Sequence, residues 1–173
     1  HTLPALVTPT NELASLEARA RSYLSANCAQ CHQPGGTSQA LWDARLTTTT
    51  ANAGLVNGAL FSNLGNTNNR VLVPSAISNS VLLTRLAARG PGQMPPIGST
   101  IADPQGVALI AAWITNDLPA FQTFSDWQLA RFGSTNSAEA SSLADPDGDG
   151  ANNRLEALTG TNPTNSLDAW KIS

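Results

Sequence analysis

The motif Cys28-Ala29-Gln30-Cys31-His32 constrains this chain more than any other feature of its sequence. At this spacing the two thiols can each bond to a vinyl group of one haem, and the adjacent imidazole is then held beneath the iron. A covalent macrocycle of that size becomes part of the core, so the chain must fold around it. The motif therefore predicts one covalent c-type haem, attached through Cys28 and Cys31, with His32 as an axial ligand.

The chain offers few other ligands, because it contains two cysteines, two histidines and one methionine. His1 stands at the end of the chain, where residues are usually poorly ordered, so His32 is the well-placed imidazole. Met94 lies in Gly92-Gln93-Met94-Pro95-Pro96, where prolines stiffen the backbone, and we expect its thioether to be the second axial ligand. The alternative for Met94 is an ordinary place in the core.

Two other readings of the cysteine motif stay open at this point. A structural zinc site needs about four cysteine or histidine ligands, and the chain groups only three. A thioredoxin-like redox pair normally follows a βαβ pattern, whereas the sequence before Cys28 has the periodicity of a helix. Both readings are less favoured than haem attachment.

The apolar periodicity predicts short helices separated by a long polar loop. A helix over 11–26, capped by Asn11, leads directly into Cys28, and Asp103 with Pro104 begins another helix that ends near Asn116. The full set of expected segments is a helix at 11–26, a short helix at 39–46 capped by Ser38, a loop at 47–69, a helix at 80–88 followed by a terminating Gly90, and a helix at 103–116.

In this order of elements, residues 11–118 resemble a class I c-type cytochrome domain. The resemblance implies an all-α cytochrome c fold, with about four to five short helices around the haem and the first helix packed across the last. It also implies that Cys28 and Cys31 form thioethers, that His32 is the proximal ligand and Met94 the distal one, and that the Pro34 carbonyl accepts the His32 ring proton. Trp42, Arg45 and Arg70 could contact the haem propionates, although a core tryptophan and solvated arginines are the simpler expectation.

With both axial positions filled, the iron is suited to electron transfer and not to binding oxygen or peroxide. We therefore expect an electron-transfer protein, or the electron-transfer domain of a larger oxidoreductase, with no separate enzymatic site. The stretch from Trp42 to Met94 is also similar to cytochrome modules fused to exported bacterial quinoprotein sugar dehydrogenases, which implies a dehydrogenase as electron donor. The alternative is a haem peroxidase or gas-binding sensor in which Met94 is absent from the iron or readily displaced.

A second pattern lies near the end of the chain, where residues 145–156 fit the calcium-loop pattern D-x-D-x-D-G-x5-E. Hard oxygen donors at these positions can surround Ca²⁺, and Gly150 permits the sharp turn. The alternative is a solvated acidic loop, in which the carboxylates repel one another without a cation. The expected ligands are Asp145, Asp147, Asp149, the carbonyl of Ala151, Asn153 and Glu156, with Asn165 and Asp168 as weaker candidates.

The segment around this loop resembles the EF-hand-like, thrombospondin type 3-like calcium repeats of exported bacterial proteins. We expect a helix over 121–132 to connect it to the preceding part, and its apolar residues to be buried. The predicted organisation is a cytochrome domain at 1–119 and a connecting helix with a calcium-binding appendage at 120–173. A calcium-stabilised adhesion or interaction module, in which the haem is incidental, is a further alternative function for the chain.

Composition limits the partners and the compartment. Charged residues make up 12% of the chain, about half the usual share of globular proteins, and the net charge is −3, so nucleic acid is not an expected partner. No run of roughly 20 apolar residues predicts a membrane span. This composition suits an exported protein, and the resemblance implies haem attachment outside the bacterial cytoplasmic membrane. We therefore expect a periplasmic or extracellular protein, processed or excised from a longer precursor.

Overall fold

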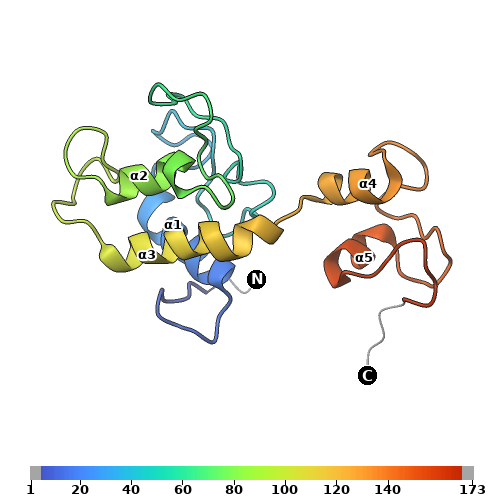
Figure 1. Ribbon diagram of the computed structural model, residues 1–173. Coiled ribbons are helices and arrows are strands. Elements are labelled where there is room, and N and C mark those ends of the chain that lie inside the picture. The colour runs from blue at the N-terminus through green and yellow to red at the C-terminus, as the bar shows by residue number, and fades with distance from the viewer. Residues whose placement is uncertain (1–4, 169–173) are drawn as a thin grey trace. The chain divides into compact units, whose positions relative to one another are not determined.

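The computed structural model describes residues 5–168, so His1 lies outside the described residues. The chain divides into two compact units, His1–Phe121 and Gln122–Ser173 (Figure 1). Between residues 5 and 168 the structure is helical without β-strands, apart from two isolated bridges, in agreement with the predicted all-α class. No helix in this range is both long and apolar enough to cross a membrane.

Helix α1 (Leu16–Cys28) carries the chain into the cysteine motif. It begins at Leu16 because the Ser15 hydroxyl accepts a hydrogen bond from the Ala18 amide at 3.1 Å, which caps the first turn. The predicted start at Asn11 is wrong, since the Asn11 side chain accepts from the Leu13 amide in a local turn and Leu13 is fully exposed. The prediction that a helix ends at the motif is confirmed.

Two further helices complete the first unit. A 3-10 turn (Ile77–Asn79) precedes α2 (Val81–Ala87), which confirms the helix expected at 80–88, although it ends in an extended Ala88 before reaching Gly90. The Asp103 carboxylate accepts from the Gln105 and Gly106 amides and so caps α3 (Pro104–Ala112), as predicted. The chain then continues through a π-helical turn (Trp113–Asp117) and a 3-10 turn (Leu118–Ala120).

The helix expected at 39–46 is absent, and local hydrogen bonds explain the error. The Asp43 carboxylate accepts from the Arg45 amide at 2.9 Å and from the Thr48 hydroxyl at 2.7 Å, which folds the segment into an irregular turn. The guanidinium of Arg21, on α1, takes the carbonyls of residues 43, 45 and 48. The amides of Asp43 and Ala44, which would donate to the first turn of such a helix, donate instead to the Ala53 and His32 carbonyls, both at 2.8 Å.

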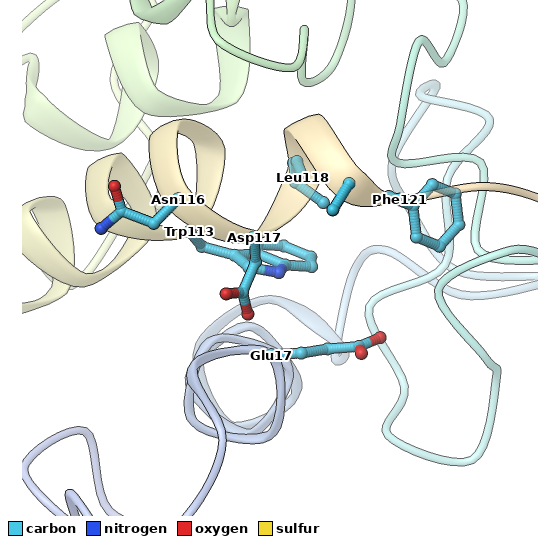
Figure 2. Close-up of a pocket in the computed structure, with 7 residues that line it drawn as sticks. Glu17, Trp113, Asn116, Asp117, Leu118 and Phe121 are labelled. Atoms are coloured by element: carbon cyan, nitrogen blue, oxygen red, sulfur yellow. The ribbon is translucent and has the colours of Figure 1, made fainter. Parts of the chain in front are cut away.

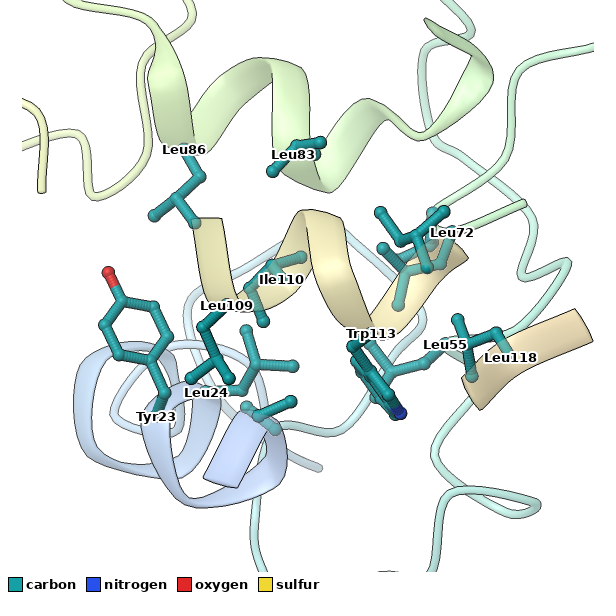
Figure 3. Close-up of a cluster of buried hydrophobic side chains, with 14 of the residues drawn as sticks. Tyr23, Leu24, Leu55, Leu72, Leu83, Leu86, Leu109, Ile110, Trp113 and Leu118 are labelled. Atoms are coloured by element: carbon teal, nitrogen blue, oxygen red, sulfur yellow. The ribbon is translucent and has the colours of Figure 1, made fainter. Parts of the chain in front are cut away.

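The core of the first unit lies on both sides of α3 (Figure 3). Leu109 and Ile110 of α3 pack against Leu24 of α1, and Leu83 and Leu86 of α2 cover the opposite side. Each fully buried side chain of this size stabilises the fold by about 1.5–3 kcal/mol relative to exposure. This packing fixes α1, and therefore the end of α1 at Cys28, against the rest of the unit.

Helices α1 and α3 approach most closely at Gly106. A Cβ atom at this position would lie 2.2 Å from the Cζ atom of Tyr23 and 2.6 Å from its Cε2 atom. No side chain fits in that space without moving the buried Tyr23 ring. Glycine is therefore required by the helix crossing, even though it is a poor helix former.

The C-terminal unit contains α4 (Phe124–Phe132) and α5 (Asn153–Thr159). Helix α4 begins three residues later than predicted because Thr123 and Asp126 form a reciprocal capping box, whereas Phe121 packs against the core of the first unit. Trp127 stacks with Phe124, and Gln128 donates to the Ala140 carbonyl at 2.6 Å. The buried face of α4 is thus covered within its own unit.

We expect Gly106→Ala to destabilise the first unit by about 1–3 kcal/mol, because the added methyl overpacks the crossing. The matched control is Ala108→Gly on the exposed face of the same helix, which should cost about 1 kcal/mol through helix propensity alone. Chemical denaturation of the full chain measures both. A Gly106→Ala protein that is more stable than the wild type would contradict the close crossing.

Candidate functional site

The cysteine motif forms a single turn that continues from the end of α1. The amides of Cys31 and His32 both donate to the Cys28 carbonyl, at 3.1 and 2.8 Å. Both thiols are free and half-buried. The structure therefore brings the three predicted residues of the motif together at one turn, with each sulfur still available for a thioether.

The protonation of Cys28 argues against a thioredoxin-like role. Burial raises the pKa of the Cys28 thiol to about 12, and the neighbouring Cys31 adds to the shift. A reactive dithiol requires the opposite, because the attacking cysteine of such a pair has a lowered pKa and is a thiolate near neutral pH. The motif in this environment is not poised for thiol–disulfide exchange.

The His32 imidazole is buried and stacks on an aromatic ring. Its ring stacks on Trp42, with ring centroids 4.0 Å apart and the planes inclined by 25°. Burial lowers the pKa of His32, which favours the neutral form that binds a metal. The predicted hydrogen bond from the ring to the Pro34 carbonyl is wrong for this structure, since the buried Nδ1 atom has no partner among the described residues.

Met94 is half-buried in a loop that hydrogen bonds hold in shape. The Met94 amide donates to the Arg85 carbonyl at the end of α2, at 2.9 Å. The side chain of Gln93 accepts from the Gly90 amide at 2.7 Å and donates to the carbonyls of Pro95 and Ser99, at 3.1 and 2.9 Å. Gln93 therefore closes the methionine loop on itself, a role that the sequence analysis missed.

These residues fit a c-type haem in their chemistry. Two free thiols in one turn can form the thioethers, and a buried imidazole next to them can bind the iron. Met94 offers a thioether from a braced loop, separate in sequence from the motif. The set lacks the fourth ligand that a structural zinc site would need.

The three side chains considered for propionate contacts have protein partners. Trp42 is buried in the core of the first unit. Arg45 pairs with Asp43 at 2.7 Å, and the hydrogen bonds from Arg45 hold the pKa of that carboxyl well below its usual range. Arg70 donates to the carbonyls of Thr67 and Asn69. Each of these partners gives its side chain a role within the fold.

In the C-terminal unit, the acidic loop gathers oxygen atoms around one point. Asp145, Asp147 and Asp149 each offer a carboxylate oxygen, and these atoms lie within 4.8 Å of one another. Backbone amides shape the loop: Gly148 and Gly150 donate to the two oxygens of Asp145, at 2.9 and 3.0 Å. The loop is therefore folded so that like charges converge.

Several other oxygens of this loop have no hydrogen-bond partner in the part of the chain that the structure describes. They are one oxygen each of Asp147, Asp149 and Asn153, and both carboxylate oxygens of Glu156, which is 0% exposed. Burial raises the pKa of Glu156, and the charges of Asp147 and Asp149 raise it further. A buried carboxylate without hydrogen bonds is costly unless a cation compensates it, so these orphaned oxygens fit a bound Ca²⁺.

Asn153 is held so that its oxygen stays free. Its side-chain nitrogen donates to the carbonyls of Glu139 and Ser141, at 2.6 and 2.7 Å, which fixes the direction of the amide. The sequence analysis did not predict these two bonds to Glu139 and Ser141, because the calcium-loop pattern covers residues 145–156 only. Asp168 and Asn165 instead accept from the amides of Asn162 and Leu167.

Ala151, the expected carbonyl ligand, is buried just before α5. Its amide donates to an oxygen of Asp149 at 2.7 Å, which keeps the end of the loop against the acidic cluster. The neighbouring Asn152 serves as the N-cap of α5 by accepting from the Leu155 amide. This cap orients the first turn of α5, from which Asn153 and Glu156 are presented.

A hollow of about 320 Å³ lies in the first unit beside Glu17 and Asp117 (Figure 2). Trp113 and Phe121 form its apolar walls, and Glu17 also accepts a hydrogen bond from the Thr50 hydroxyl. None of its lining residues belongs to the cysteine motif or to the methionine loop. The hollow is therefore separate from the proposed haem ligands.

Comparison with known proteins gives no assignment: no family model, characterised protein or solved structure matches the chain. The functional argument depends on the geometry of the chain itself.

We expect Ca²⁺ to raise the stability of the C-terminal unit, by about 2.7 kcal/mol at a free concentration of roughly 100 times Kd. Glu156→Gln should abolish this response and raise the stability of the calcium-free protein, because it removes an uncompensated buried charge. Glu139→Gln, an exposed carboxylate outside the loop, is the control. Calorimetry of the full chain with EDTA and with Ca²⁺ measures both effects. A wild-type calcium response in Glu156→Gln would contradict the site.

Proposed function

We propose that the first unit is a mono-haem c-type cytochrome domain that transfers single electrons. The observation that carries the proposal is the turn at the end of α1, where two free thiols and a buried imidazole meet. This combination suits covalent haem and neither a zinc site nor a thiolate redox pair. The proposal includes the class I cytochrome fold for this helical unit.

Each residue would have a separate part in this function. Cys28 and Cys31 would hold the macrocycle covalently, and His32 and Met94 would be the two ligands of its iron. The haem, when bound, supplies the one-electron couple between Fe(II) and Fe(III). Filling both axial positions leaves no position for a substrate, and the thioether raises the reduction potential.

Apolar side chains in the segments that follow His32 and Met94 support the same proposal. Leu41 and Phe61 are 83% and 74% exposed, and Ile97 and Ile101 are 82% and 81% exposed. A contiguous apolar surface binds another group or protein, and we propose that these four side chains contribute to one. We propose a redox protein as the partner, such as an attached or co-exported dehydrogenase, in the bacterial periplasm or outside the cell.

For the second unit we propose a structural calcium site. Orphaned, buried oxygens of Asp147, Asp149, Asn153 and Glu156 support it, and Asp145 and the Ala151 carbonyl complete the expected ligand set. Extracellular calcium modules typically bind with a Kd of about 10⁻⁴ to 10⁻³ M. The ion would stabilise the unit without taking part in electron transfer.

A test of the axial ligands separates electron transfer from the peroxidase or gas-binding alternative. We expect the oxidised protein to show the weak sulfur-to-iron charge-transfer absorption band, and the reduced protein to bind no CO. Met94→Ala should lose the band and bind CO, whereas Thr100→Ala, an exposed residue after the same loop, should behave as the wild type. A wild-type protein that lacks the band and binds CO would instead favour the alternative.

The methionine loop gives a second prediction. Gln93→Ala should allow added imidazole to displace Met94 with about tenfold tighter apparent affinity, as expected if the loop loses about 1.4 kcal/mol of stability with its hydrogen bonds. Gln105→Ala, on the exposed side of α3, is the matched control and should leave the affinity unchanged. Titration of the oxidised protein with imidazole measures both; equal affinities in the two variants would rule out the bracing role of Gln93.

A further inference from the structure

The orientation of the His32 ring has an unusual source. In metal sites the second ring nitrogen normally donates to a carbonyl or carboxylate, which fixes the rotation of the imidazole. Here the Nδ1 atom is buried without a partner among residues 5–168. The directed contact that the ring does make is the face-to-face stack on Trp42, at 4.0 Å and 25°.

Hydrogen bonds fix the backbone directly after Trp42. The Asp43 amide donates to the Ala53 carbonyl, and the Ala44 amide donates to the carbonyl of His32 itself, both at 2.8 Å. Trp42 is 8% exposed and belongs to the core of the first unit. The segment 42–44 therefore contacts His32 twice, through the Trp42 ring and through the Ala44 amide.

The Arg21 side chain is hydrogen-bonded to the segment that follows Trp42. The guanidinium is 3% exposed and donates to the carbonyls of Asp43, Arg45 and Thr48, at 3.4, 2.7 and 2.6 Å. An arginine fork can bind several carbonyls at fixed angles, whereas lysine offers a single point of charge. Because Arg21 lies on α1, the same helix that ends at Cys28 also anchors the loop that contacts His32.

We infer that Trp42 sets the rotation of the His32 imidazole by ring stacking, and that Arg21 is the positioning residue that keeps Trp42 there. This inference rests on the proposed haem function, and it assigns the orienting role that a hydrogen-bond acceptor has in most metal sites to an aromatic face. Stacking fixes the plane of the ring without raising its basicity, which an acceptor at Nδ1 would do. In this arrangement the orientation of the His32 ring is fixed by Trp42, whereas the basicity of the ring is not raised by a hydrogen-bond acceptor.

The test uses the oxidised full-length holoprotein and the NMR shifts of the haem methyl groups. In low-spin Fe(III) the unpaired spin follows the planes of the axial ligands, so these shifts report the rotation of the imidazole. Trp42→Leu removes the aromatic face, and Trp42→Phe retains a smaller one. Arg21→Met removes the donors to the loop, and Arg19→Met, on the same helix but hydrogen-bonded to Pro9, is the control.

We expect Trp42→Leu to change the spread of the methyl shifts, Trp42→Phe to stay close to the wild type, and Arg21→Met to move in the direction of Trp42→Leu. Arg19→Met should leave the pattern unchanged. A wild-type pattern in Trp42→Leu overturns the inference, and the Trp42 pair decides it even if Arg21→Met does not accumulate. A wild-type pattern in folded Arg21→Met overturns the role of Arg21.

Covalent haem in the wild-type protein tests the proposed function separately from the role of Trp42, and it is measured first. If the wild-type protein carries no covalent haem, the proposed function fails before any variant is made. If the wild type carries haem with Met94 bound and Trp42→Leu has the wild-type shifts, only the present inference fails.

Discussion

The packing of α1 across α3 is the contact on which the proposed haem site depends. Gly106 lets the two helices approach until the Tyr23 ring lies against the backbone of α3, and Leu24 is buried in the same interface. Because α1 ends at Cys28, this crossing determines where both thiols and His32 lie. Arg21, one turn before Leu24 on the buried side of α1, extends the same anchorage to the loop that contains Trp42. One short helix therefore positions the attachment turn and the wall against which His32 rests.

The two units handle buried polar groups in different ways. In the first unit, the buried guanidinium of Arg21 is satisfied by carbonyls of the chain itself. In the second, both carboxylate oxygens of Glu156 are buried and unsatisfied among residues 5–168, and so is the oxygen of Asn153, whose nitrogen is hydrogen-bonded. A protein gains nothing from such an arrangement unless a cation completes it, because an uncompensated buried charge is strongly unfavourable. The unsatisfied oxygens of Glu156 and Asn153 therefore support a calcium site more strongly than the number of acidic residues does.

The sequence predicted best what short-range chemistry controls. The cap at Asp103, the helix leading into Cys28 and the spacing of the acidic loop could all be read from neighbouring residues. The expected helix at 39–46 was wrong because the Asp43 and Ala44 amides donate to the Ala53 and His32 carbonyls, outside that segment. The bond from His32 to Pro34 was also wrong, and the Trp42 stack that the structure has instead depends on a fold-level contact. Long-range contacts of this kind leave no local periodicity, and the bracing of the methionine loop by Gln93 was missed for a similar reason.

The central claim is that this chain carries a covalent haem at the turn after α1. The most direct measurement is the intact mass of the denatured protein, produced in a bacterial periplasm with the haem-attachment machinery, beside a Cys28→Ala/Cys31→Ala variant. The account predicts that the wild-type chain keeps the added mass of one haem after denaturation and that the variant has the mass of the polypeptide alone. A wild-type chain that leaves the same cells without that added mass would contradict the account.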